Sequence, residues 1–225
     1  MSPRLRFADS STAQDALIFA RRAARLLDDE VRLQAAGGTL AMTSAPLAPV
    51  GLLDSTPLVI ALRALRADPE LVCDLVVPAA SLSADPDDPA ALRLPDSAVS
   101  AAWAGVSPPR SGWSETGAFP ASTIAARAQW GIAAVAEAVP GDPGADAVRA
   151  VRAHVWGRPD DALDGLPLGV AFAAFTMGFI GGDESARVLR SGPWTRITFA
   201  RGHVIARGPV RAGLTPVRST GPGAP

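Results

Sequence analysis

The chain has 225 residues, of which 48% are hydrophobic and 19% charged, a composition typical of a folded globular protein that excludes a disordered chain. Its formal net charge of -1 is unevenly distributed. Residues 186–225 contain seven arginines and no acid, whereas residues 1–185 contain 14 arginines and all 22 acids, a net charge of -8. A cationic end on an acidic body predicts a surface that binds something negative.

The single cysteine and the N-terminal residues indicate the compartment. Cys73 is the only cysteine, which excludes an intramolecular disulfide. Residues 1–6 lead into a polar run without the apolar stretch of a signal peptide. No uninterrupted apolar stretch reaches the roughly 18 residues that a transmembrane helix needs. We therefore expect a cytoplasmic protein that does not contact the membrane.

Residues 1–80 show helix and strand periodicities in the order β-α-β-β-β-β. Ser11 and Gln14 have the spacing of a helix capping box, so we expect a helix from there to about Leu27. Gly37 and Gly38 fit a type I′ turn, because both central residues of that turn need positive φ. The expected strands are Leu5–Phe7, Val31–Ala35, Thr39–Ser44, Leu58–Leu65 and Leu71–Val77. Together they predict an antiparallel sheet with one helix laid across it.

Residues 81–118 are expected to form an acidic, proline-rich linker and then a loop flanked by tryptophans. The linker contains Asp85, Asp87 and Asp88 among prolines, which favours an irregular segment. The loop, Trp103–Trp113, contains Pro108-Pro109, which forces an extended backbone. We expect its two indole rings to pin the loop to the body of the protein.

Residues 119–210 are expected to form a unit of three helices followed by a basic hairpin. The expected helices run from about Ser122 to Val139, between Gly144 and Trp156, and over Leu166–Ile180. The last is apolar nearly all round, which predicts a central helix that is buried on all sides. Small residues along it, Gly169 and Gly178, indicate either close core packing or the seam of a homodimer. With the sheet of residues 1–80, this unit gives the fold class α+β.

The hairpin is expected to consist of Thr195–Ala200 and His203–Arg207, joined by a turn at Arg201-Gly202. Residues 211–225, rich in proline and glycine, are expected to be a disordered tail. The turn places Arg196 directly opposite Arg207, and like charges in that position are unfavourable by up to about 1 kcal/mol. Something negative should therefore lie between them. It is either an acid of the same chain, such as Asp160 or Asp161, or an external acidic protein partner or phosphate-bearing ligand.

These considerations favour a non-enzymatic binding or scaffold protein. Its partner-binding or anion-binding residues would be Trp194, Arg196, Arg201, His203 and Arg207. An exposed Trp194 would support this hypothesis.

The first alternative is low-specificity nucleic-acid binding. Three helices followed by a basic hairpin have the order of a winged-helix domain, in which the third helix reads the bases. Here that helix, Leu166–Ile180, has no side chain for base readout, so only weak, salt-sensitive phosphate contact by the hairpin is expected.

The second alternative is an enzyme with a site at the junction of the two units. Its candidate residues are Arg110, Ser111, His154 and His203. The chain has no nucleophile elbow and no phosphate-binding glycine loop. With two histidines and one cysteine, it predicts neither a metal site nor a cofactor.

Three segments carry a family resemblance. Trp103–Trp113, Arg190–Trp194 and Arg201–His203 resemble segments of an uncharacterised conserved protein family of high-GC actinobacteria. The resemblance spans most of the chain and implies a bacterial source. It implies no activity and no site residue.

Overall fold

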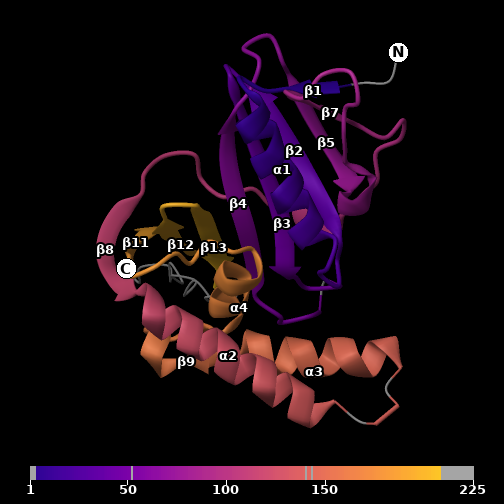
Figure 1. Cartoon of the computed structure of the whole chain (residues 1–225). Coiled ribbons are helices and arrows are strands. Elements are labelled where there is room, and N and C mark those ends of the chain that lie inside the picture. Colours follow the sequence, from indigo (N-terminus) through magenta and orange to yellow (C-terminus); the bar gives the residue numbers. More distant parts are fainter. Residues whose placement is uncertain (1–3, 52, 140, 143, 209–225) are drawn as a thin grey trace, which may run out of the picture.

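An eight-stranded antiparallel sheet forms the centre of the protein (Figure 1). The computed structural model describes residues 4–51, 53–139, 141–142 and 144–208. The strand order is β5-β2-β3-β4-β13-β12-β11-β8. The bounds are β2 Glu30–Ala36, β3 Thr39–Leu47, β4 Leu58–Arg66, β5 Cys73–Pro78, β8 Ser114–Pro120, β11 Ser185–Ser191, β12 Trp194–Phe199 and β13 Gly202–Arg207. With the helices that cover one of its faces, this sheet confirms the α+β class.

The helices form one side of the molecule. They are α1 Ser10–Ala23, α2 Ala121–Ala138, α3 Ala145–Gly157 and α4 Gly169–Thr176. Helices α1 and α4 pack on the sheet, and α2 and α3 lie against α4 and beside each other (Figure 1). One continuous apolar core joins the sheet to these helices, so the two predicted units share a core. Within the described residues, no helix combines the length and the apolar content needed to cross a membrane.

The N-terminal half contains the predicted order of elements. Strand β1 (Arg4–Arg6) is followed by α1 and then by β2 to β5. The β2–β3 turn is the predicted one, since Gly37 and Gly38 have φ values of +56° and +78°. The cap of α1 differs from the prediction: Asp9, not Ser11, is the N-cap residue, and its Oδ1 accepts a 2.7 Å hydrogen bond from the Thr12 amide.

The two halves of the sheet repeat one arrangement. In chain order each has a strand, a helix and a three-stranded meander, β1-α1-β2-β3-β4 in the first half and β8-α2-β11-β12-β13 in the second; β8 is an edge strand of the large sheet, whereas β1 lies in a separate small sheet. The last strands of the two meanders, β4 and β13, pair antiparallel at the middle of the sheet. Helices α3 and α4 and the short strands β9 (Pro159–Asp160) and β10 (Leu166–Pro167) lie between α2 and β11 in the chain.

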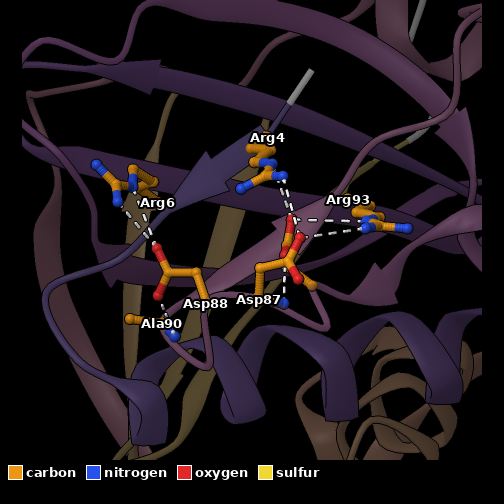
Figure 2. Close-up of polar contacts among 7 residues, drawn as sticks. Arg4, Arg6, Asp87, Asp88, Ala90 and Arg93 are labelled. Carbon is orange, nitrogen blue, oxygen red and sulfur yellow. Dashed lines mark hydrogen bonds and ion pairs between the residues drawn. The ribbon is translucent and has the colours of Figure 1, made fainter. Parts of the chain in front are cut away.

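The segment predicted as an acidic linker is attached to the body by strands and ion pairs. Strands β6 (Ser83–Ala84) and β7 (Ala91–Arg93) join β1 in a small sheet of order β1-β7-β6. Figure 2 shows Asp88 bound to Arg6, with a distance of 3.1 Å between Oδ2 and Nη2. The buried Asp85 carboxylate lies 2.9 Å from Arg4 Nε and 3.6 Å from Arg93 Nε. These acids therefore neutralise arginines that the N-terminal strand brings to the same place.

The segment Leu166–Ile180 is not one long helix. Helix α4 spans only Gly169–Thr176, and Gly178 follows in the left-handed conformation at φ +64°. Arg22 of α1 occupies the helix end, where its Nη1 donates a 2.6 Å hydrogen bond to the Met177 carbonyl. Residues 169–174 are buried as predicted, but Phe175 is 40% exposed, so burial on all sides is wrong at that position.

The burial of α4 also bears on the predicted homodimer. Gly169 packs within this chain, since a Cβ there would lie 3.0 Å from Leu47 and 3.1 Å from the Trp156 carbonyl oxygen. Helix α4 therefore cannot supply a seam between two copies. The homodimer itself stays a prediction.

The C-terminal hairpin is present in a different register. The turn is Ala200-Arg201, so Arg196 pairs with Ile205 and Arg207 pairs with Trp194. The predicted opposition of Arg196 and Arg207 is therefore wrong. Because the register differs by two residues, each side chain keeps its predicted face. Strands β11 and β8, which were not expected, continue the sheet beyond β12.

The winged-helix interpretation is wrong for the same reasons. The hairpin lies inside a continuous sheet, with β11 on one side and β4 on the other. The third helix of the second half, α4, is buried and cannot enter a DNA groove. The predicted disordered tail, residues 211–225, lies outside the described residues.

The two phenylalanines of α4 give a test of this arrangement. Phe172 is 6% exposed and stacks on Trp156 with 4.5 Å between ring centroids, whereas Phe175 is 40% exposed. We expect Phe172→Ala to lower the free energy of unfolding by about 3–5 kcal/mol and Phe175→Ala by less than about 1 kcal/mol. Urea denaturation of the two variants measures the difference, and equal losses would contradict the structure.

Candidate functional site

A groove lies on the face of the sheet that the helices leave free. The segment Trp103–Trp113 crosses this outer face, and beside it a hollow of about 510 Å³ opens over β3, β4 and β13. Its floor consists mostly of small or aliphatic side chains: Ala41, Thr43, Ile60, Leu62, Ala64 and Ile205. A floor of this kind leaves room for a bound chain close to the sheet.

Trp103 and Arg32 attach the first end of the crossing segment. Trp103 is 6% exposed and packs in a second apolar cluster with Ile60, Trp194 and Ile205. Arg32, on β2, donates a 2.6 Å hydrogen bond from Nη1 to the Ala104 carbonyl.

The Arg32 guanidinium is itself held by a carboxylate. Its Nε and Nη2 each donate a 2.8 Å hydrogen bond to Asp74 on β5, a bidentate pair. Hydrogen bonding to Asp74 raises the pKa of Arg32, and hydrogen bonding from Arg32 holds the pKa of Asp74 below its usual value. The Asp74 charge is thus compensated within the protein.

Trp113 and Arg196 meet at the second end of the segment. The Trp113 Nε1–H donates a 2.9 Å hydrogen bond to the Pro109 carbonyl, which fixes the indole. The Arg196 guanidinium on β12 lies over this ring, with 4.7 Å from Cζ to the ring centroid. Between Arg32 and Arg196 the segment therefore crosses the sheet from β2 to β12.

Arg196 is a partly buried cation that pairs with none of the Asp and Glu side chains of the chain. All 22 acidic residues lie in the described part of the chain, and none has a carboxylate oxygen within 4.0 Å of the Arg196 guanidinium. Its Nε is buried without a hydrogen-bond partner among the described residues. Burial, and secondarily the charge of Arg187, lowers the pKa of Arg196. Its positive charge is thus disfavoured where it stands.

The predicted internal acids lie elsewhere. Asp160 accepts a 2.9 Å hydrogen bond from Arg127 Nε on α2, and Asp161 is exposed. Arg187, whose charge helps to lower the pKa of Arg196, pairs with Glu115 across β11 and β8 at 3.3 Å. The hypothesis of an internal carboxylate between the hairpin arginines is therefore wrong.

His203 lines the same groove on β13. Its Nδ1 lies 3.1 Å from Thr198 Oγ1. Burial, and after it the charges of Arg196 and Arg187, lowers the pKa of His203 to about 4. His203 is therefore neutral at pH 7 and adds a hydrogen-bonding group without a charge.

The other predicted site residues take different places. Trp194 is on the same face but only 6% exposed, so it supports Arg207, whose Cζ lies 5.7 Å from its ring centroid, and offers no contact surface. Arg201 is in the turn, where its carbonyl accepts a hydrogen bond from Arg63, and its guanidinium lies close to Gly181 on the helix side. The groove thus contains Arg196 and His203, and Arg201 is separate from it.

The candidate residues for an enzyme are not assembled into one site. Arg110 and His203 line the groove, whereas Ser111 is exposed outside it and His154 is exposed on α3. Strands β4, β3 and β2 separate His203 from Asp74, the acid that lines the groove, which puts them about 19 Å apart. Among the residues that the structure describes, no group of three or more potential ligands is placed to hold a metal ion.

Arg32 and Asp74 are the functional residues that sequence reasoning missed. Both point outward on predicted strands, so the alternation of apolar and polar residues was sufficient to predict that they lie on the outer face of the sheet. Their pairing depends on β5 lying beside β2, which the order of strands in the chain does not reveal.

His203 gives a test of the electrostatics of the groove. The pKa falls from 6.5 in the unfolded chain to about 4 in the folded protein, so the unfolded state binds more protons between these values. The stability that His203 provides is complete above pH 6.5 and is lost as the pH falls toward 4, a change of about 3 kcal/mol.

We therefore expect the free energy of unfolding to fall more steeply between pH 7 and pH 4 for the wild type than for His203→Gln. Urea denaturation at a series of pH values measures both curves. Parallel curves would show that His203 is not desolvated beside the two arginines.

Solved structures of partial likeness include bacterial sliding clamps. The DNA polymerase sliding clamp from Caulobacter crescentus shares 14% identity over 98% of this chain and 69% of that chain, with a TM-score of 0.48. A second structure, Caulobacter crescentus pol III beta, shares 14% identity over 91% of this chain and 65% of that chain, with a TM-score of 0.47. At this level the likeness supports no conclusion about function.

Family comparisons divide the chain into two. No curated protein matches it. Residues 1–105 match the family described as Domain of unknown function (DUF8010), and residues 108–211 match Domain of unknown function (DUF8185). The actinobacterial source stays a prediction. Both matches are to families described only as domains of unknown function, which agrees with the predicted resemblance to an uncharacterised family.

Proposed function

We propose that the protein is a non-enzymatic binding protein that holds an acidic segment of a partner protein in the outer groove of its sheet. The observation that supports this most directly is Arg196, a partly buried guanidinium whose Nε has no hydrogen-bond partner among the described residues and which pairs with no Asp or Glu. Removing a charge from water without pairing it costs free energy, and an acidic ligand would recover that cost.

The charges that line the groove favour an acidic ligand. Asp74 is bound by Arg32, so the unpaired charges are those of Arg110 and Arg196, both positive. A carboxylate that reaches Arg196 would make charge-assisted hydrogen bonds, which are worth about 1.5–3 kcal/mol each. It would also reduce the repulsion between Arg196 and Arg187.

Trp113 makes the site selective in shape. Because its ring is fixed by the hydrogen bond to Pro109, it holds the Arg196 guanidinium flat on one side. We expect a ligand to approach the other side of the guanidinium and the edge that its two Nη atoms form. A planar carboxylate matches that edge in a bidentate manner. The partner would therefore present glutamate or aspartate from an extended segment.

Isothermal titration calorimetry with a hexaglutamate peptide tests this proposal. We expect Arg196→Met to weaken binding at least tenfold, since it removes the charge and keeps an apolar stem of similar shape over Trp113. Arg190→Met is the matched control, because Arg190 is also an arginine of the second half, is exposed, and does not line the groove. It removes the same charge and should change binding by less than about twofold.

The thermal stability of Arg196→Met tests whether an internal group or an external ligand compensates the charge of Arg196. Since no acid of the chain pairs with it, Arg196→Met leaves no carboxylate unpaired, and we expect its melting temperature to stay equal or rise. A clear loss of stability that high salt does not remove would show that an internal group compensates Arg196. Binding of hexaglutamate that Arg196→Met leaves unchanged would refute the proposed site.

Two further probes distinguish the other ligands that carry negative charge. Inorganic phosphate tests the phosphate-bearing alternative, and oligothymidylate tests low-specificity nucleic-acid binding. Tighter binding of oligothymidylate than of hexaglutamate, with a steep loss of affinity in salt, would replace the protein partner by a nucleic acid.

A further inference from the structure

A second pocket lies between helix α3 and the β3–β4 connection and shares no lining residue with the outer groove. Helix α3, the β3–β4 connection and the residues after α1 enclose a hollow of about 320 Å³. This volume is at the lower end of the range for small-molecule sites. Its apolar wall consists of Leu27, Pro46, Leu47, Val50, Ala150 and Ala153. Leu27 and Val50 are 42% and 66% exposed, so apolar surface faces solvent at the mouth of the pocket.

Arg152 of α3 also lines this pocket, and the nearby Asp28 carboxylate pairs with Arg149 instead. Among the described residues, which include every acid of the chain, no carboxylate oxygen lies within 4.0 Å of the Arg152 guanidinium. Instead its Cζ lies 4.9 Å from the centroid of the Phe172 ring, which stacks on Trp156. Burial lowers the pKa of Arg152, so its charge is held in a partly desolvated place.

The other charged residues that line the pocket are an arginine paired with an acid and three acids. Arg149 is paired with Asp28 at 3.0 Å. Asp54 accepts hydrogen bonds from the Val50 and Thr56 amides at 2.9 Å each, so it closes the β3–β4 connection. With Asp146, the lining contains three acids and two arginines. This balance disfavours an anion of high charge and permits a single carboxylate.

From the apolar wall and the unpaired guanidinium we infer that this pocket binds a small apolar monocarboxylate. The carboxylate would pair with Arg152, and the hydrocarbon part would cover Leu27, Leu47 and Val50. An apolar molecule without the acid group would bury the same wall but leave Arg152 uncompensated. A ligand of this class differs from the acidic segment proposed for the outer groove, and the two sites share no residue.

Octanoate is the probe for this pocket, and octan-1-ol and inorganic phosphate are the comparison ligands. We expect calorimetry on the full chain to show octanoate binding more tightly than octan-1-ol, and phosphate not competing. Arg152→Met should weaken octanoate at least tenfold and leave octan-1-ol within about twofold. Arg158→Met is the matched control, since Arg158 follows α3 directly, is exposed, and lies outside the pocket.

A second variant keeps the inference testable if Arg152→Met fails to fold. Ala153→Leu fills the pocket from its apolar wall without touching a charge, so it should abolish the binding of both octanoate and octan-1-ol. Absence of octanoate binding to the wild type at millimolar concentration would overturn the inference. So would octanoate binding that neither variant weakens, or competition by phosphate. None of these results depends on hexaglutamate binding, which concerns the outer groove.

Discussion

The antiparallel pairing of β4 with β13 is the contact on which the rest of the structure depends. It joins two meanders, one from each matched family, into a single sheet with a single apolar core beneath the helices. The outer face becomes continuous through the same contact. The groove therefore draws Ile60 and Leu62 from the first half and Arg196 and His203 from the second. Neither half alone contains the site.

The charge asymmetry of the sequence takes a specific form in the fold. Several acids of the N-terminal part are paired with arginines of the same part, as Asp85 and Asp88 are with the arginines of β1 and Asp74 is with Arg32. The second half of the sheet has few acids nearby, and Glu115 is bound by Arg187. A cation placed there is left without a partner. Of the arginines at the C-terminal end that the structure describes, Arg187, Arg190 and Arg201 are exposed, and Arg196 and Arg207 are partly buried on the outer face of the sheet.

Local patterns in the sequence were sufficient to predict the elements that form through contacts between residues close together in the chain. The Gly37-Gly38 turn fixes β2 against β3, because its dihedral angles permit one register. The α+β class and helices α2 and α3 followed from periodicity. The errors arose where distant residues decide. Arg22, on another helix, ends α4, and the neighbours β11 and β4 bind the hairpin on both sides, so its register cannot be derived from the turn residues alone.

Arg196 and Arg152, on which the two proposed sites depend, have one contact in common. Arg196 lies on Trp113 and Arg152 lies on Phe172, so an aromatic face holds each guanidinium where an acid would otherwise be expected. A ring stabilises a cation by electrostatic attraction without using up its N–H donors. The ring contact uses none of these donors, and it orders the side chain, so a carboxylate ligand would not have to supply the entropy of fixing it. An internal salt bridge would give similar order but consume the same donors, which is why the absence of an ion pair with Asp or Glu at these two residues supports binding sites rather than structural contacts.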